Sequence, residues 1–347
     1  MMRAKHKPRT YELFVGVDIA AESARVALLK QDGAAEAEFS IAQTTSGMTE
    51  LKQALLATKR KAVAVLVVME ATGSYWMRLA MALYEAGFAV SILNPLQACH
   101  FAQTLLKRAK TDAVDARMLA QYAHMLQPEP WTPAPHIYEE LLQRLNERDS
   151  LIQMRQQVRN QLHALRHRPS VVPVVKQRME ALLVTFQGQI EAIEDEISAL
   201  MEQSHAWAVS AQLLQTIPGV GAITAAWLLV ATHNFTSCDT PEQLAAYAGL
   251  APFAYQSGTS VHRRSTIKHV GHARLRRALY LASLSATRYN PVIKRFYDRL
   301  KDRGKSIKVA RCAAARKLIH LAWAVVIKQT PFDPDHLQRQ VIQHQMT

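Results

Sequence analysis

The sequence predicts an α/β domain at the N-terminus, followed by a helical hairpin and a mainly α-helical C-terminal domain. Three observations support this organisation. Apolar, strand-like runs alternate with amphipathic helical patterns through about the first 125 residues, and apolar residues recur at three- and four-residue spacing between residues 137 and 201. Beyond residue 205 the chain is helical with loops and carries most of the positive charge. A chain of 347 residues, 49% of them hydrophobic, can bury the cores of two or more domains.

The first domain is expected to contain a mixed sheet. The expected elements, in order, are strands at 12–19, 24–30 and 36–42, a helix at 46–57, a strand at 62–69, a helix at 75–86, a strand at 88–93 and a helix at 96–125 that breaks near Lys110. Short turns such as Gln31-Asp32-Gly33 join the first three strands, which predicts an antiparallel meander. The continuous apolar run at 62–69 is typical of a strand covered on both faces. This order of elements is that of a ribonuclease-H-like domain.

Four acidic residues lie where such a fold would hold a divalent metal. Asp18 and Glu70 end two apolar strands, and Asp112 and Asp115 are three residues apart, which places both on one face of a helix. Ionised carboxylates at the ends of buried strands are costly unless a cation compensates them. Hard oxygen ligands suit Mg²⁺ or Mn²⁺, and such ions stabilise the attacking and leaving oxygens of phosphoryl transfer. We therefore expect these acids to be metal ligands and catalytic residues rather than scattered surface carboxylates.

A proline-rich linker at 128–136 separates this domain from a helical hairpin at 137–205. Two apolar runs with 3/4 spacing flank Pro169 and Pro173, which predicts an antiparallel coiled-coil arm. The runs are Leu151, Met154, Val158 and Leu165, then Leu183, Phe186, Ile190, Ile193, Ile197 and Leu200. The weak net charge of the hairpin favours protein–protein packing over nucleic-acid binding. An arm that assembles a homodimer or homotetramer is preferred to a simple spacer.

The positive charge is segregated along the chain. Residues 1–135, 136–205 and 206–347 carry net charges of +3, −2 and +13, which together give +14. Such a field indicates a polyanionic partner, with a merely soluble basic surface as the alternative. No apolar stretch reaches the length of a membrane span, and the basic N-terminus lacks the apolar segment of a signal peptide. The three cysteines are isolated, which suits a reducing compartment, so we expect a cytoplasmic protein that associates with the nucleoid when active.

The C-terminal domain, expected at 206–330 with a tail at 331–347, contains a candidate phosphate-binding turn. The string Ile217-Pro218-Gly219-Val220-Gly221 predicts a helix-hairpin-helix-like element whose glycines expose backbone amides at the start of the next helix. An ordinary helix corner is the alternative. Basic residues become dense further along the chain and suit a phosphate backbone. The expected nucleic-acid contacts are Pro218, Gly219, Gly221, Arg263, Arg264, Lys268, Arg274, Arg276 and Arg277.

Taken in order, these motifs resemble the DEDD transposases of the IS110 family of bacterial insertion sequences, a group that includes the Piv-type DNA invertases. The motifs are compatible with the IS1111 branch of that family. The resemblance spans almost the whole chain. The strings that carry it are Gly16-Val17-Asp18, Met69-Glu70-Ala71-Thr72-Gly73-Ser74-Tyr75-Trp76, Lys110-Thr111-Asp112-Ala113-Val114-Asp115-Ala116, Ile217-Pro218-Gly219-Val220-Gly221, Ala248-Gly249-Leu250-Ala251-Pro252, Ser257-Gly258 and Gly271-His272-Ala273-Arg274-Leu275-Arg276-Arg277.

The resemblance implies a RuvC-like DEDD catalytic domain at 1–127 and a C-terminal transposase domain at 206–330. It also implies a recombinase guided by a noncoding bridge RNA that the element encodes, which pairs with donor and target double-stranded DNA. Ser257, just before Gly258, matches the serine that links covalently to DNA, with Ser260 as the second choice and a turn-supporting loop serine as the alternative. Two other functions stay open: a RuvC-like structure-selective DNA nuclease that hydrolyses with water, and a non-enzymatic nucleic-acid-binding protein.

Overall fold

The computed structural model describes residues 10–105, 112–257, 261–267 and 270–335, with the backbone alone at 112–113, 253–257 and 261–265. The chain divides into two compact units, Met1–Pro133 and Ala134–Thr347. Over the described ranges, no helix is both long enough and apolar enough to cross a membrane.

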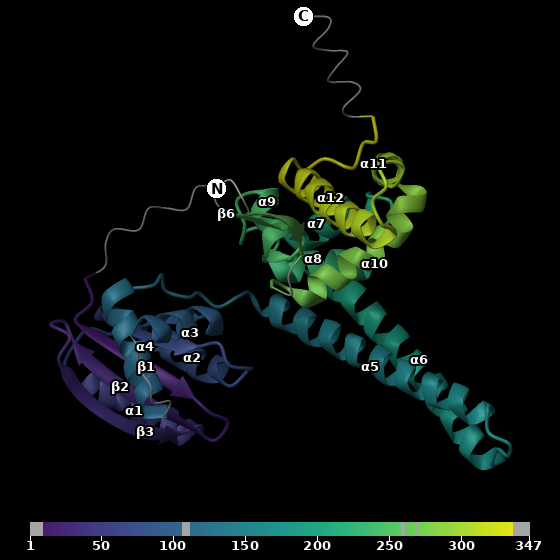
Figure 1. Ribbon diagram of the computed structural model, residues 1–347. Coiled ribbons are helices and arrows are strands. Elements are labelled where there is room, and N and C mark those ends of the chain that lie inside the picture. Colours follow the sequence, from purple (N-terminus) through teal and green to yellow (C-terminus); the bar gives the residue numbers. More distant parts are fainter. Residues whose placement is uncertain (1–9, 106–111, 258–260, 268–269, 336–347) are drawn as a thin grey trace, which may run out of the picture. The chain divides into compact units, whose positions relative to one another are not determined.

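A five-stranded mixed sheet of order β3-β2-β1-β4-β5 forms the centre of the first unit (Figure 1). The first three strands form the predicted antiparallel meander, and β4 and β5 continue the sheet parallel to β1. The expected strand at 62–69 begins as a short 3-10 turn, η1 (Ala62–Ala64). The strands are β1 (Leu13–Ile19), β2 (Ser23–Lys30), β3 (Ala35–Ala42), β4 (Val65–Glu70) and β5 (Ala89–Leu93).

Helices cover both faces of this sheet, as the continuous apolar strands predict. On one face α1 (Thr45–Ala57) and α2 (Trp76–Glu85) pack on the odd-numbered side chains of β1, such as Val15. On the other, α3 (Pro95–Thr104) and α4 (Asp112–Leu126) pack on the even-numbered ones, such as Phe14. The expected helix at 96–125 is therefore two helices, and the expected break near Lys110 lies outside the described residues. This mixed α/β unit agrees with the predicted ribonuclease-H-like order of elements.

Two long helices, α5 (His136–Arg166) and α6 (Pro173–Gln203), run side by side and project beyond the other helices of the second unit (Figure 1). They are antiparallel, because ion pairs join early α5 to late α6 and late α5 to early α6, as in Arg144–Glu196 and Arg166–Glu180.

The predicted apolar stripes of this arm are buried on α6 nearest the rest of the unit, whereas Leu151, Val158, Leu165, Leu183 and Phe186 are only partly buried. The expected stripe on α6 is confirmed at Ile190, Ile193, Ile197 and Leu200, which are buried. On α5 one expectation is wrong: Met154 is 41% exposed, while Leu162 is buried. Arg155 takes an inward position and donates to Gln187 across the hairpin, and this polar contact shifts the phase of the stripe.

The remaining helices enclose a core around α8, whose last eight residues are all buried. The helices are α7 (His205–Gln215), α8 (Ala222–Thr232), α9 (Pro241–Tyr247), α10 (Ala273–Tyr289), α11 (Pro291–Asp302) and α12 (Ile307–Ile327). A two-stranded antiparallel hairpin, β6 (Phe253–Ser257) and β7 (Val261–Thr266), interrupts them. We expected helices and loops here, because these strands are short, polar and without clear alternation.

Candidate functional site

Asp18 and Glu70 meet at one edge of the sheet. Strands β1 and β4 are parallel neighbours with Gly16 opposite Val68 and Val17 opposite Met69, so the next position sets Asp18 beside Glu70. Adjacent strands are about 4.8 Å apart. Both acids are half-buried. The register thus places two carboxylate residues next to each other where the two strands end.

Both carboxylates lie on the face that α3 and α4 cover. Side chains alternate along a strand, and Phe14 in β1 and Val68 in β4 belong to the core beneath α4. Asp18 shares the parity of Phe14, and Glu70 shares that of Val68. The two side chains therefore emerge on the α4 side of the sheet.

Helix α4 lies against β1 because Gly16 has no side chain. A Cβ built at Gly16 would lie 2.1 Å from the Ala116 carbonyl oxygen and 2.2 Å from the Ala120 nitrogen. Further along α4, the His124 ring meets the Phe14 ring at 5.0 Å between centroids, so the helix runs antiparallel to the strand. The N-terminal end of α4 is therefore at the Asp18 end of β1.

This direction brings Asp115 level with Asp18. Asp18 is two strand residues beyond Gly16, about 6.6 Å. Asp115 is one helical turn, about 6 Å, before Leu119, whose backbone contacts the Gly16 position. The backbone of Asp112 begins α4 one turn further on, and its side chain lies outside the described residues. Three predicted ligands thus come from β1, β4 and α4 to one corner of the unit.

Several polar contacts hold this corner. The Thr72 hydroxyl donates to the Glu70 carboxylate over 3.2 Å. The Gln43 amide donates to the carbonyls of Ala20, after β1, and Tyr75, after β4, at 3.4 and 3.3 Å. Arg117 on α4 forms a bidentate pair with Glu38 of β3, and this bond lowers the pKa of Glu38. These contacts fix the two turns and the helix that carry the acids.

Arg25 is a further residue of this corner that the sequence reasoning missed. It stands opposite Asp18 in the antiparallel pairing of β1 and β2, and its Nη1 donates to the Ser40 hydroxyl over 2.8 Å. Residues directly opposite in such a pair have Cβ atoms about 5 Å apart. Arg25 therefore brings positive charge beside the first acid. Only the strand register reveals that the two residues are neighbours, because positions 18 and 25 do not belong to one sequence motif.

The donor set of this corner fits a hard divalent cation. Carboxylate oxygens are the ligands that Mg²⁺ and Mn²⁺ prefer. The described side chains of Asp18, Glu70 and Asp115 do not by themselves close into a group of three metal ligands. The Asp112 carboxylate, the fourth predicted ligand, lies outside the described residues.

The second unit carries the predicted serine on the β6–β7 hairpin. Ser257 ends β6 and pairs in register with Val261; its side chain, and those of Arg263 and Arg264, lie outside the described residues, as do Ser260 and Lys268. Ser257 belongs to the second compact unit, and the four acids belong to the first.

Backbone contacts hold together the two ends of the segment that carries this hairpin, at 247–249 and 270–272. Gly249 and Gly271 have φ values of +69° and +93°, and a Cβ at Gly271 would lie 2.6 Å from the Tyr247 carbonyl oxygen. The His272 amide donates to that same carbonyl at 2.7 Å, and Arg276 Nη1 donates to the Val270 carbonyl at 2.8 Å. Predicted as a nucleic-acid contact, Arg276 thus also has a structural role at the base of the hairpin.

His272 caps the helix that follows the hairpin. Its Nδ1 accepts from the Leu275 amide at 3.1 Å, so the neutral ring is required. Burial lowers the pKa of His272, and Arg274 and Arg276 lower it further. The ring also lies 6.0 Å from that of Trp227. His272 therefore connects the hairpin base to the core.

The two glycines of the predicted phosphate-binding turn have different surroundings. Gly219, with φ of +102°, packs on α10, because a Cβ there would lie 2.6 Å from the Ala286 Cβ. The Pro218 carbonyl accepts from the buried Asn290 side chain at 3.3 Å. Gly221, in contrast, has nothing within 4 Å of its Cβ position and begins α8 without a side-chain cap. An anion would therefore have access at Gly221 rather than at Gly219.

Exposed cations extend from α10 to the start of α12. Arg274 and Arg277 are exposed on α10. The corner between α11 and α12, centred on Gly304, adds a group of exposed basic side chains for which no ion pair is found among the described residues. Its members are Lys294, Arg295, Arg299, Lys301, Arg303, Lys305 and Lys308. Two exposed acidic residues, Asp298 and Asp302, share this corner, so its net charge is reduced but stays strongly positive and suits a phosphate backbone.

Family models match both units of the chain. A model described as transposase, of the IS110 DEDD type, matches residues 15–166, and one described as the transposase IS116/IS110/IS902 family matches residues 211–298. The chain is 32% identical to the pilin gene-inverting protein of Moraxella bovis over 323 residues, covering 92% of this chain and 97% of that protein. It is 25% identical over 307 residues to the transposase for insertion sequence element IS1328 of Yersinia enterocolitica, covering 77% and 85%.

Proposed function

The chain belongs to the IS110 family of DEDD transposases, related to the pilin gene-inverting proteins, and from this premise we propose that it is an RNA-guided DNA recombinase with a serine nucleophile. Family membership makes it an enzyme of DNA transposition or site-specific recombination. The proposal adds the guide RNA, the covalent serine–DNA intermediate and the residues that perform the reaction. The observation that carries it is the convergence of Asp18, Glu70 and α4 on one edge of the sheet.

In the proposed reaction the Ser257 hydroxyl oxygen attacks a backbone phosphorus of DNA. The bond from Oγ to phosphorus forms, the bond from phosphorus to the 3′-oxygen breaks, and the departing 3′-oxygen gains the proton that the serine loses. The product is a phosphoserine link, so the energy of the phosphodiester is kept for rejoining. Attack by the 3′-hydroxyl of another strand then reverses the step and releases Ser257.

In this proposal the four acids would hold the metal. Asp18, Glu70, Asp112 and Asp115 would bind Mg²⁺ or Mn²⁺, which when bound supplies positive charge near the departing oxygen and lowers the pKa of a bound hydroxyl. Thr72 orients Glu70, and Gln43 fixes the two turns that follow β1 and β4. Arg25 beside Asp18 limits the repulsion between the acids and the phosphate backbone.

Basic surfaces of the second unit position the nucleic acids. We assign backbone contacts to Arg263, Arg264, Lys268, Arg274 and Arg277, and to the amides that follow Gly221. The element-encoded guide RNA would pair with donor and target DNA, so base pairing selects the sequence of the paired segments while these residues contact the backbone. Assembly into a homodimer or homotetramer would bring the Ser257 hairpin of one copy to an acidic site.

The test is to trap the covalent intermediate. The full chain, loaded with its RNA and duplex DNA in Mg²⁺, is denatured during the reaction, and nucleotide adducts are mapped by mass spectrometry. The adduct is expected on the Ser257 peptide, absent in Ser257→Ala and retained in Ser260→Ala. Asp18→Asn, Glu70→Gln and Asp115→Asn should each abolish cleavage while DNA binding in chelator stays within about twofold of the parent.

Two outcomes would replace the proposal. Cleavage that persists in Ser257→Ala without any adduct identifies the alternative, a RuvC-like metal-dependent nuclease that uses water. An active enzyme after complete removal of RNA excludes guidance. For the guide itself, the RNA that copurifies should contain segments complementary to both DNA partners, and changing one segment should redirect joining to a matching DNA.

A further inference from the structure

The arm formed by α5 and α6 has two chemically different halves. From residue 150 to residue 180, around the tip, the chain has six basic residues and one acidic residue, whereas 136–149 and 181–203 together have two basic and nine acidic residues. The near-neutral charge of the whole hairpin conceals this division. The expectation that the arm favours protein packing over nucleic-acid binding rested on that average, so the exposed face of α5 in the basic half needs a separate explanation.

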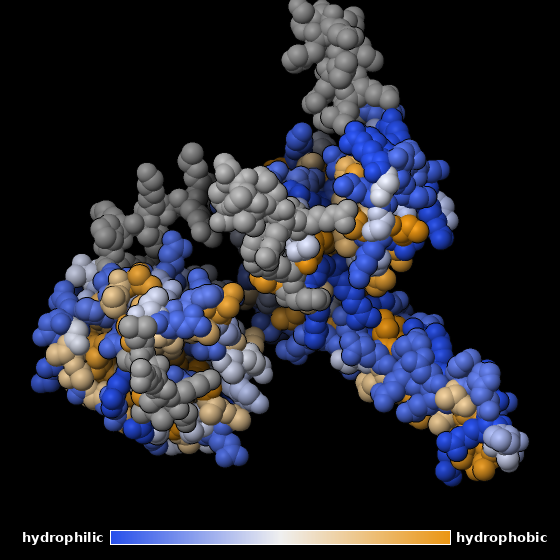
Figure 2. Space-filling view, in the orientation of Figure 1, coloured by the Kyte–Doolittle hydropathy of each residue, from blue (hydrophilic) through white to orange (hydrophobic). Residues whose placement is uncertain are grey.

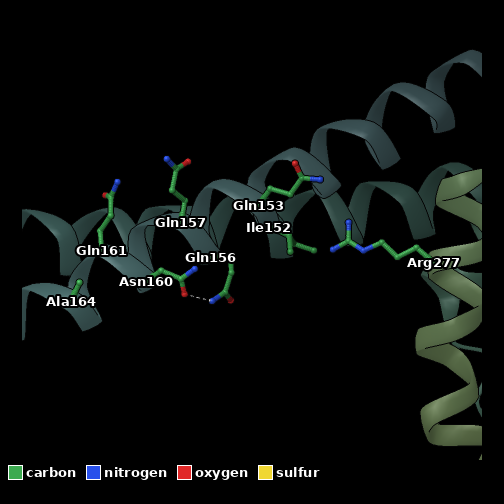
Figure 3. Close-up of a pocket in the computed structure, with 8 residues that line it drawn as sticks. All are labelled: Ile152, Gln153, Gln156, Gln157, Asn160, Gln161, Ala164 and Arg277. Atoms are coloured by element: carbon green, nitrogen blue, oxygen red, sulfur yellow. Dashed lines mark hydrogen bonds between the residues drawn. The ribbon is translucent and has the colours of Figure 1, made fainter. Parts of the chain in front are cut away.

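That face carries an open groove of about 650 Å³ along the distal half of α5. Five carboxamide side chains line it, together with Ile152, Ala164 and the guanidinium of Arg277 from α10 (Figure 3). The carboxamide residues are Gln153, Gln156, Gln157, Asn160 and Gln161. Their side chains are exposed, and no acidic residue takes part in the lining. In the space-filling view the surface of the arm is largely hydrophilic (Figure 2).

The groove presents its amides in a regular order. Gln153, Gln157 and Gln161 follow one another at four-residue spacing and point to the same side of α5 (Figure 3). Gln156 and Asn160 form a second row and are joined by a 2.8 Å hydrogen bond. Arg277 extends from α10 to the inner end of the groove, so the amide rows continue the exposed arginines of α10. Along the helix the rows span roughly 12 Å.

These groups match the edges and backbone of duplex DNA. Carboxamides both donate and accept, and Gln or Asn pairs with adenine as Arg pairs with guanine in the major groove. That groove is about 12 Å wide and admits one α-helix, whereas the major groove of A-form RNA is too narrow for side chains to read. We propose that the amide face of α5, with Arg277, lies in the major groove of the substrate DNA. The proposal rests on the proposed function for its DNA substrate, and it does not depend on Ser257 or on the acids.

The experiment adds negative charge to the face without changing its shape. In the full chain Gln153, Gln157 and Gln161 are replaced together by Glu, which retains side-chain size and helix propensity. The matched control replaces Gln177, Gln189 and Gln203, all exposed on α6, by Glu. Binding of a fluorescent DNA duplex of about three helical turns is measured by anisotropy in chelator over a range of salt concentrations.

The α5 variant should bind duplex DNA about tenfold or more weakly, the effect of losing one or two good contacts. The control should stay within about twofold of the parent, with unchanged melting temperature in both. Arg277→Gln alone should weaken binding of the DNA duplex. Combined with the α5 variant, it should lower the affinity by less than the product of the two separate fold-changes, because the residues share one groove. Equal losses in the α5 and α6 variants, or no loss, would overturn the proposal. So would a loss confined to a structured RNA with duplex binding unchanged. Because chelator prevents cleavage, failure of the serine chemistry would leave these results intact.

Discussion

Replacing Gly16 by alanine should separate the acidic site from its supporting helix. A methyl group on Gly16 would lie 2.1 Å from the Ala116 carbonyl oxygen, 2.2 Å from the Ala120 nitrogen and 2.8 Å from the Leu119 carbonyl carbon. All three atoms belong to the backbone of α4, so no side chain can rotate away. Restoring an ordinary contact of about 3.4 Å requires α4 to move about 1.3 Å away from β1.

This movement would displace Asp115 and Asp112 relative to Asp18 and Glu70. Overpacking of this kind costs about 1–3 kcal/mol, or roughly 3 °C in melting temperature for each kcal/mol. A displacement of about 1 Å at a catalytic constellation can lower the rate about 100-fold. We therefore expect a folded protein, slightly less stable, in which metal-dependent DNA cleavage falls about 100-fold.

Gly188→Ala is the matched control, because Gly188 lies within α6 and nothing is within 4 Å of its Cβ position. This change should leave activity unaltered and raise stability by up to about 1 kcal/mol. Melting temperature, duplex binding in chelator and cleavage in Mg²⁺ are measured for both variants. Parental cleavage and melting temperature in Gly16→Ala would refute the proposed packing of α4. A complete loss of folding would be separated from a catalytic effect by near-ultraviolet circular dichroism.

Two further predictions concern the second unit. His272→Ala should cost about 1 kcal/mol of unfolding free energy through loss of the α10 cap, while His272→Asn, which can also cap, should cost less. Burial lowers the pKa of His272 below its usual 6.5, so the neutral ring contributes its full stabilisation of the fold above pH 6.5. This contribution decreases as the pH falls towards the folded-state pKa. In urea titrations at several pH values, His272→Ala should lack this part of the pH dependence of the unfolding free energy. Ile193→Asp should unfold the arm, because Ile193 packs in the core of its own chain. Val184→Asp, at a side chain that is 74% exposed, should leave folding intact. If the arm self-associates, Val184→Asp should also lower the mass of the assembly measured by light scattering.

The first unit could be predicted closely from sequence, for a physical reason. Strands β1 and β4 are continuous apolar runs, and the acid that ends each of them, Asp18 or Glu70, identifies both the strand and its end. The pairing of strands was harder to predict, because the side-chain pattern of β1 does not indicate which strands lie on either side of it. Strand pairing decides that Arg25 lies beside Asp18 and that Gln43 joins two turns. Neither contact could therefore be predicted from the sequence.

The second unit was less predictable, because polar residues occupy inward positions. The partly exposed Arg155 reaches across the hairpin to Gln187, so counting apolar residues placed Met154 inside and omitted Leu162. The β6–β7 hairpin lacks alternation, and its base depends on contacts between Gly249 and Gly271, which are distant in sequence. Gly219 illustrates the same limit, since a turn glycine gives no indication that it packs on Ala286.

The division of the machinery between two units has a consequence for control of the reaction. The acids belong to the first unit and Ser257 to the second, and each is fixed locally: the acids by Gly16 and Gln43, the hairpin by Gly271 and His272. In the proposed mechanism these two rigid parts have to meet for chemistry, so their meeting would be the step that commits the enzyme. The exposed basic residues of α10 to α12 belong to the second unit, and the acids would bind their metal most completely with a phosphate oxygen present. The substrate itself would then bring the parts together, and we expect that a chain without correctly paired nucleic acid does not cut DNA.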